Sequence, residues 1–136
     1  MFDRRLRWCA ATLCLCGTGL AAVSVVPAFR RLGTGPGLVF VVVAVAFVAF
    51  AMAVLRAWRW ALALCAAALG GQALAVIGTV AELVAGVDAA KARQVRLIGF
   101  DPVVAVSINL VYSAVGFGLF CWLLARWLRW RSTPAG

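Results

Sequence analysis

Four long apolar runs constrain what this chain can fold into more than any other feature. They cover residues 8–26, 37–55, 60–87 and 102–125 of a 136-residue sequence. A helix needs about 20 apolar residues to cross a hydrocarbon core of about 30 Å, and each run meets or approaches that length. The runs lack the period-2 alternation of barrel strands, and an open sheet leaves backbone groups unpaired in lipid. The sequence therefore predicts an all-α protein, a transmembrane four-helix bundle in one integral membrane domain over residues 1–136.

Composition supports the same class of protein. Hydrophobic residues make up 66% of the chain and charged residues only 12%, which leaves too little polar surface to cover a soluble globule of this size. The net charge is +9, but the basic residues stand in short blocks between apolar runs. In that position they indicate membrane topology and contact with lipid headgroups. We therefore expect a bilayer with anionic headgroups as partner, and no nucleic acid.

The first apolar run has a second interpretation as a secretory signal. "MFDRRLRW" followed by "CAATLCLCGTGLAAVSVV" has the basic and apolar regions of such a signal. The segment that follows, "VPAFRRLG", has no clear small-x-small cleavage site, and no cysteine stands in a convincing lipoprotein box. We therefore favour an uncleaved first helix.

Two residue types predict the orientation of the chain in the cell membrane. If both termini share one side, that side carries eight arginines, and the other side carries four arginines and one lysine. The positive-inside rule then places both termini in the cytoplasm. Tryptophans gather at the same helix ends, as interfacial anchors do. These predicted anchors are Trp8, Trp58, Trp60, Trp122, Trp127 and Trp130.

The segment "DAAKARQVRLIGFDP" connects the third and fourth runs on the predicted outer face. Asp101 before Pro102 is a typical helix start, because the carboxylate accepts a hydrogen bond from a free backbone N–H and proline has no N–H to satisfy. Asp88 is placed to begin a short amphipathic helix through Ile98, and Gly99 is suited to end it in the left-handed conformation. An irregular loop is the alternative.

The third and fourth runs each carry one stripe of polar and small residues. At about 100° per residue, the polar side chains of each run fall on one face of its helix. Polar groups are costly toward lipid, so the two stripes are expected to face each other, with glycines at positions 71, 78, 86 and 116 permitting close approach. The predicted cluster consists of Gln72, Thr79 and Glu82 in the third helix and Asn109, Tyr112 and Ser113 in the fourth.

The first two runs differ from this pattern. The first has a thinner stripe of Cys9, Thr12, Cys16 and Gly19, which is expected to complete the packing. The second has no polar atom in its side chains except a thioether. It is predicted to be the most lipid-exposed helix.

Glu82 is the acidic residue with the greatest consequence for function. It lies within about two turns of the predicted outer surface, at the depth of Asn109 on the next helix. Its structural interpretation is a hydrogen bond to Asn109 and Tyr112, or an ion pair with a loop arginine such as Arg96, that fixes helix register. The alternative is a carboxylate that exchanges a proton or a cation in a polar crevice.

The chain carries no motif for catalysis or for a cofactor. It has no histidine, which excludes bis-His haem, His-containing metal sites and Ser-His or Cys-His mechanisms. Its four acidic residues are too scattered for a dicarboxylate site. The five cysteines lie within or at the ends of apolar runs and are expected to be small apolar fillers, with Cys9 and Cys121 the only candidates for acylation.

The segment "GTVAELVAGVDAAKARQVRLIGFDPVVAVSINLVYSAVGF", residues 78–117, resembles the distal half of small four-span integral membrane proteins of actinobacteria, a family without an assigned activity. The resemblance implies membrane localisation and four spans. The favoured function is that of an accessory, structural or partner-binding membrane protein, as a homo-oligomer or with a larger membrane partner. A small proton- or cation-coupled transporter that uses Glu82 is the first alternative, and a lipid-modifying membrane enzyme is the second.

Overall fold

The computed structural model describes residues 2–132, with backbone only for residues 130–132. This part of the chain is helical and contains no strand. Its helices are α1 (Arg4–Arg31), α2 (Thr34–Leu55), α3 (Arg59–Ala85), α4 (Ala89–Leu97) and α5 (Pro102–Ser132). Four of them, α1, α2, α3 and α5, are long and apolar enough to cross a membrane. The predicted all-α class is confirmed, and the helices fit a multi-pass membrane protein.

Two aspartates begin the first and the last membrane-length helices. The Asp3 carboxylate accepts a hydrogen bond from the Leu6 backbone N–H at 2.8 Å and caps α1. The Asp101 carboxylate accepts bonds from the N–H groups of Val103 and Val104 at 2.9 and 3.2 Å, directly before α5. Each cap satisfies donors that the first helical turn leaves free. The predicted start of the last helix is therefore confirmed.

The connection between α3 and α5 contains the short helix α4, as its sequence predicts. Asp88 begins this helix and accepts a hydrogen bond from the Ala90 N–H at 3.5 Å. Gly99 follows its end with a φ of 94°, in the left-handed region that glycine adopts without strain. The alternative of an irregular loop is therefore wrong.

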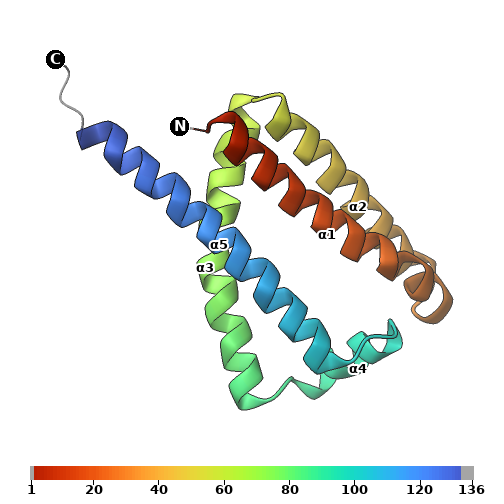
Figure 1. Cartoon of the computed structure of the whole chain (residues 1–136). Coiled ribbons are helices and arrows are strands. Elements are labelled where there is room, and N and C mark those ends of the chain that lie inside the picture. Colours follow the sequence, from red (N-terminus) through yellow and green to blue (C-terminus); the bar gives the residue numbers. More distant parts are fainter. Residues whose placement is uncertain (1, 133–136) are drawn as a thin grey trace.

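The four long helices form two pairs rather than one evenly packed bundle. α1 runs antiparallel to α2 along its length, and α5 crosses α3 (Figure 1). Contacts between the α1/α2 pair and the α3/α5 pair are fewer than contacts within each pair. The short helix α4 contacts both α5 and α1, so it connects the two pairs at one end of the molecule (Figure 1).

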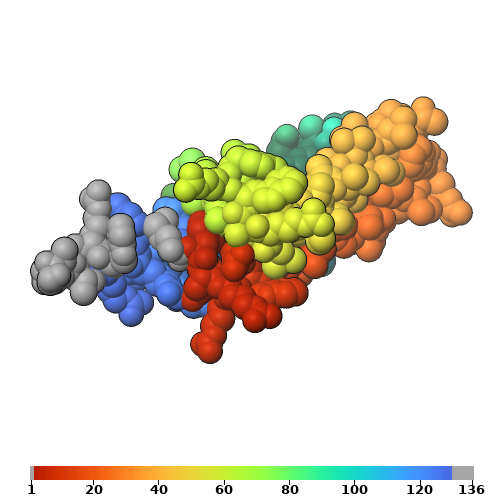
Figure 2. Space-filling view, turned by 90° about the horizontal axis from the view of Figure 1, so that it is seen from above, coloured from red at the N-terminus to blue at the C-terminus, as the bar shows by residue number. Residues whose placement is uncertain are grey.

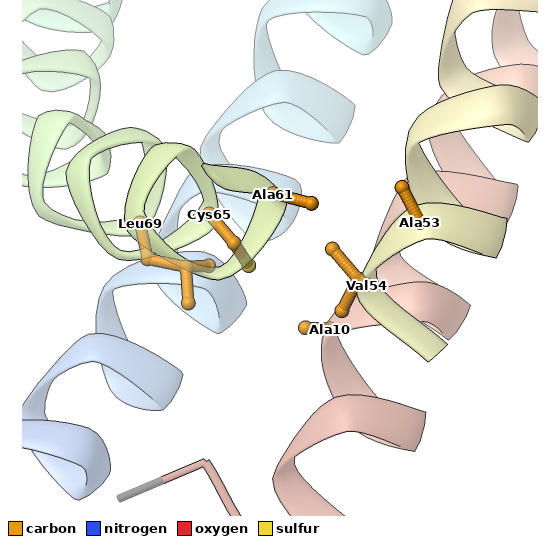
Figure 3. Packing of buried hydrophobic residues seen from close by; sticks show 6 residues of the cluster. All are labelled: Ala10, Ala53, Val54, Ala61, Cys65 and Leu69. Atoms are coloured by element: carbon orange, nitrogen blue, oxygen red, sulfur yellow. The ribbon is translucent and has the colours of Figure 1, made fainter. Parts of the chain in front are cut away.

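The two pairs meet at the opposite end, where α1 starts and α2 connects to α3; we call it the termini end. A space-filling view of this end shows the start of α1 against the α2–α3 connection (Figure 2). The Arg7 guanidinium donates a hydrogen bond to the Leu55 carbonyl at 3.1 Å across this contact. Beneath it lies a buried apolar cluster, which consists of Ala10, Ala53, Val54, Ala61, Cys65 and Leu69 (Figure 3). The termini end is therefore closed by packing from α1, α2 and α3.

Small residues, rather than the predicted stripe, form the packed face of α1. Cys9, Thr12, Cys16 and Gly19 are exposed, so the prediction for this stripe is wrong. The Thr12 hydroxyl donates to the Trp8 carbonyl at 2.9 Å, which satisfies it without burial. Small side chains let helix backbones approach closely, and they determine the packed face instead. That face consists of Leu6, Ala10, Ala11, Cys14, Gly17, Ala21, Ser24 and Ala28.

The apolar surface of α2 is exposed along most of its length. Val39, Val42 and Val45 are between 60% and 66% exposed, as suits side chains that face lipid. The membrane-length parts of α3 and α5 are buried to the same small extent as that of α2. The prediction that α2 is the most lipid-exposed helix stays a prediction, because α2 is less buried than α1 and level with α3 and α5.

Candidate functional site

The predicted polar cluster divides into three parts, and the first lies between α3 and α5. The Asn109 amide donates to the Thr79 hydroxyl at 3.0 Å, and that hydroxyl donates to the Ala75 carbonyl at 2.6 Å. Thr79 is 4% exposed, and Ser113, one turn beyond Asn109 on the same face of α5, is 1% exposed. Asn109 itself is exposed, so this is a partly buried polar contact, of a kind that holds two membrane helices in register. These residues stabilise the packing of α5 on α3, and Asn109 also lines an apolar groove between the two helix pairs.

Gln72 belongs to the same interface and packs against Gly116. A Cβ atom at Gly116 would lie 2.7 Å from Gln72 Cγ and 3.4 Å from Leu13 Cδ2, so α5 has no space for a side chain there. Gly70 lies outside the predicted stripe. A Cβ atom at this position would lie 3.2 Å from the ring of Phe120, so α3 also has little space for a side chain there. The other glycines predicted to permit close approach have open space around them, so that prediction is wrong for Gly71, Gly78 and Gly86.

The second part is Glu82, which pairs with α4 rather than with α5. Its carboxylate oxygens accept bonds from Lys91 Nζ at 2.5 and 2.6 Å. The predicted partners Asn109, Tyr112 and Arg96 are therefore wrong. Glu82 lies one turn before the end of α3 and Lys91 lies in the first turn of α4, so the short connection between the two helices brings the ammonium group within reach. The side chains of Lys91 and Glu82 are 46% and 34% exposed, which makes this a surface ion pair.

The third part is Tyr112, which points away from α3 and toward the α1/α2 pair. A Cβ atom built on Gly17 of α1 would lie 3.1 Å from the Tyr112 hydroxyl and 3.3 Å from the ring of Phe47 on α2. Three helices therefore approach one another at Tyr112. This contact forms the floor of the groove between the two helix pairs.

The groove runs from this floor toward the end of the molecule that holds α4, which we call the loop end. Its volume is about 420 Å³, and α1, α2, α4 and α5 all contribute to its walls. The walls are almost entirely apolar and include Leu20, Ala21, Val39, Phe40, Ala105 and Ile108. The hydroxyl of Ser24, one of the few polar groups in the wall, donates to the Leu20 carbonyl at 3.0 Å. The groove therefore suits an apolar occupant.

A basic cavity adjoins the groove at the loop end. It has a volume of about 440 Å³, is lined by Arg30 and Arg31, and shares Ile98 and Phe100 with the groove. Arg31 Nη1 donates to the Leu97 carbonyl at 3.1 Å, which ties the end of α1 to the end of α4. Helix carbonyls at a C-terminus attract cations, so this guanidinium is held in place. Apolar and cationic surfaces thus meet at one site.

A sequence signal for the groove exists, although it is weak. Phe40 and Phe47 are seven residues apart in α2, so they lie on one helix face at about two turns' separation. Gly17 falls within the small-residue face of α1. Neither observation shows that the two helix pairs diverge here, because that depends on the packing of all four helices.

The predicted tryptophan anchors lie at one end of the long helices. Trp8, Trp58 and Trp60 are 54%, 47% and 53% exposed, and the rings of Trp58 and Trp60 have centroids 5.9 Å apart. Trp122 and Trp127 are partly buried on α5. The side chain of Trp130 falls outside the described residues. Exposed indole groups at one level suit a membrane interface, which remains a prediction.

The remaining chemistry-bearing side chains form no site within the described part of the chain. Cys14 and Cys65 are buried, whereas Cys9, Cys16 and Cys121 are exposed. No three His, Cys, Asp or Glu residues among those described are grouped so that they could hold a metal ion. Comparison with protein-family models, with curated proteins and with solved structures found no match to this chain. The resemblance of residues 78–117 to a four-span family therefore remains a prediction.

Proposed function

We propose that this chain is a small accessory membrane protein that binds a hydrophobic component of the membrane and catalyses no reaction. The observation that carries the proposal is the apolar groove of about 420 Å³ between the two helix pairs. Ligand sites in proteins commonly have volumes of roughly 300 to 1,000 Å³ with mostly apolar walls. Leu20 and Val39 in these walls are 41% and 60% exposed, so the groove is open to an occupant from the membrane.

The alternative of a proton- or cation-coupled transporter has less support. Glu82 forms an exposed ion pair with Lys91 and is not among the residues that line the groove. A carboxylate that couples transport is expected to face a polar path inside the helices. A lipid-modifying enzyme has less support again, because the chain has no histidine and only four acidic residues to act as base or nucleophile.

We also propose that both termini lie in the cytoplasm and the loop end lies outside the cell membrane. The excess of arginines near the termini supports this orientation. In a cysteine-free variant, single cysteines at Gly35 and Ala90 are expected to react with an impermeant thiol reagent from outside, and one at Thr133 is not. Labelling of Thr133 with protection of the other two would invert the orientation and leave the groove unchanged.

A groove-filling substitution tests the proposed function. Ala105 lies in the groove wall, whereas Ala114 is exposed on the same helix and does not line the groove. Delipidated protein is titrated with a mixture of phosphatidylcholine and phosphatidylglycerol, and native mass spectrometry counts the lipids retained by each chain. Wild type and Ala114→Phe are expected to retain one lipid more than Ala105→Phe, because the new ring occupies the groove.

The same spectra reveal whether protein occupies the groove. A homo-oligomer held through the groove would appear as multiples of the chain mass in wild type and as a monomer in Ala105→Phe. Thermal unfolding without lipid shows whether both variants fold. If wild type and Ala105→Phe are both folded, retain the same number of lipids and have the same oligomeric state, the proposed function is refuted.

A further inference from the structure

We propose that the groove binds one phospholipid with an anionic headgroup, its acyl chain along the groove and its phosphate at Arg30 and Arg31. This inference rests on the proposed function and names the ligand of the same site. It follows from the shape of the groove, the charge at its mouth and the physical link between the two.

The floor of the groove lies about one leaflet below the helix ends at the loop end. Its floor at Gly17 lies 14 residues before Arg31 along α1, a rise of about 21 Å at 1.5 Å per residue. On α5, Tyr112 lies 10 residues after Pro102, a rise of about 15 Å. Half of a hydrocarbon core is about 15 Å thick. A chain that enters at the loop end therefore meets the floor near the middle of the bilayer, where the acyl chains of that leaflet end.

The walls match an acyl chain in chemistry. Aliphatic side chains from all four contributing helices line the groove, and the phenyl rings of Phe40 and Phe47 add apolar surface from α2. No acidic or basic side chain lines it among the described residues. The polar side chains in the walls are only Ser24, Asn109 and Tyr112, so a polar ligand would find few hydrogen-bond partners there, whereas a hydrocarbon chain needs none. The groove therefore selects the tail and leaves the headgroup at the mouth.

The mouth carries positive charge that other groups do not neutralise. Only Arg30 and Arg31 carry charge among the residues that line the basic cavity. The Arg30 guanidinium has no hydrogen-bond or ion-pair partner within residues 2–129, and Arg31 is held in place by the Leu97 carbonyl. Lys91, by contrast, is already paired with Glu82. An anionic headgroup is attracted to the arginines of this cavity, whereas a choline group is repelled by them.

Ile98 and Phe100 connect the two recognition elements. Both residues line the groove and also the basic cavity, so the two spaces adjoin at these two side chains. One amphipathic molecule can therefore fill both spaces at once. A free phosphate ion would use only the basic cavity, and an apolar helix from another chain would leave the arginines unpaired.

Headgroup selectivity tests this inference. Each protein is titrated separately with phosphatidylglycerol and phosphatidylcholine in detergent, and native mass spectrometry measures the affinity for the first bound lipid. Wild type is expected to bind phosphatidylglycerol several-fold more tightly. Arg30→Gln is expected to weaken that binding by about fivefold and to leave phosphatidylcholine binding nearly unchanged, the loss expected for one arginine near an anionic headgroup.

Arg93→Gln is the matched control, because this exposed arginine of α4 lines neither the groove nor the basic cavity. It removes the same charge and is expected to keep the selectivity of wild type. Equal affinity for both lipids, or an equal loss in the two arginine variants, would overturn the headgroup assignment. If Ala105→Phe still abolishes binding in that case, the proposed function stands without this ligand. If a second copy of the chain displaces lipid from the groove, the inference is wrong and the occupant is protein.

Discussion

The termini end and the loop end of this molecule are built from equally apolar helices and yet pack in opposite ways. At the termini end, Leu6, Val54 and Ala61 are each 0% exposed, and α1, α2 and α3 share one cluster (Figure 3). At the loop end, the same helix pairs leave a groove of about 420 Å³ between them. Hydrophobicity alone therefore does not determine where membrane helices associate.

Side-chain size accounts for this difference. Alanines at positions 10, 53 and 61 let the helices approach closely at the termini end. At the loop end, the larger side chains of Phe40 and Ile108 are among those that line the groove. Lipid tails are as apolar as these side chains, so no hydrophobic force closes the gap. Close packing remains the main attraction, and the alanines permit it at the termini end, where Val54 and Leu69 fill the space between the helices.

The largest effect is expected from overfilling the termini end. Ala61→Phe adds a ring where the side chain is 0% exposed, so it should lower the free energy of unfolding by about 1–3 kcal/mol. Ala63→Phe, on an exposed face of α3, should change it little. Denaturant unfolding in detergent measures both. Ala105→Phe should lower the free energy of unfolding less than Ala61→Phe does, because the groove has room for the ring. An equal loss in the two variants would contradict the contrast between the two ends.

The next effect concerns the α3/α5 interface, where the two helices cross between the two ends (Figure 1). Gly116→Val places a side chain where a Cβ alone would lie 2.7 Å from Gln72 Cγ, so a loss of about 1–3 kcal/mol is expected. Gly118→Val is the matched control, because no atom lies within 4 Å of a Cβ at that position. Thermal unfolding in one detergent compares the two. If both variants unfold alike, the close approach of α5 to Gln72 is not important for stability.

A smaller effect is expected at the loop end from the Glu82–Lys91 pair. Glu82→Gln should cost about 1 kcal/mol or less and should lose that effect at high salt, because the pair is partly exposed. Lys91→Gln should lower the free energy of unfolding by the same amount. The double variant Glu82→Gln/Lys91→Gln should lower it by no more than either single variant. Proton flux in reconstituted vesicles should equal that of empty vesicles for wild type and Glu82→Gln. A flux present in wild type and absent from Glu82→Gln would restore the transport alternative.

The smallest effect is expected from acid at the termini end, where Asp3 caps α1 and pairs with Arg126 of α5. The hydrogen bond from the Leu6 N–H and then the Arg126 guanidinium hold the pKa of Asp3 below its ordinary value of 3.8. A lowered pKa means that the carboxylate stabilises the fold above that value, and that this contribution is lost as pH falls through the folded-state pKa. The melting temperature of wild type should therefore fall slightly more below pH of about 4 than that of Asp3→Asn, which keeps the cap without the charge.

The sequence predicts the helices well because their signals are local. Continuous apolar runs determine membrane-length helices whatever surrounds them, since lipid demands an internally bonded backbone. The starts of α4 and α5 follow from Asp88 and Asp101, which act on donors within three residues of themselves. The all-α class and both helix starts were therefore within reach of sequence analysis.

The candidate site could not be predicted from the sequence, because it depends on which helix faces meet. In a membrane helix almost every face is apolar, so periodicity does not distinguish a packed face from a lipid-facing one. Thr12 indicates a polar stripe in the sequence, yet it bonds to its own helix and stays exposed. Glu82 indicates a contact with α5, yet the nearest cation is Lys91 on α4.

By itself the sequence determined that this chain forms four helices of membrane length and one short connecting helix, because those elements follow from hydrocarbon length and local capping. Only the tertiary structure decided that the helices associate as two pairs, that Tyr112 faces Gly17, and that a groove opens beside Arg30. The reason is physical: close packing between apolar surfaces depends on the complementary shapes of several helices at once, and no single segment contains that information.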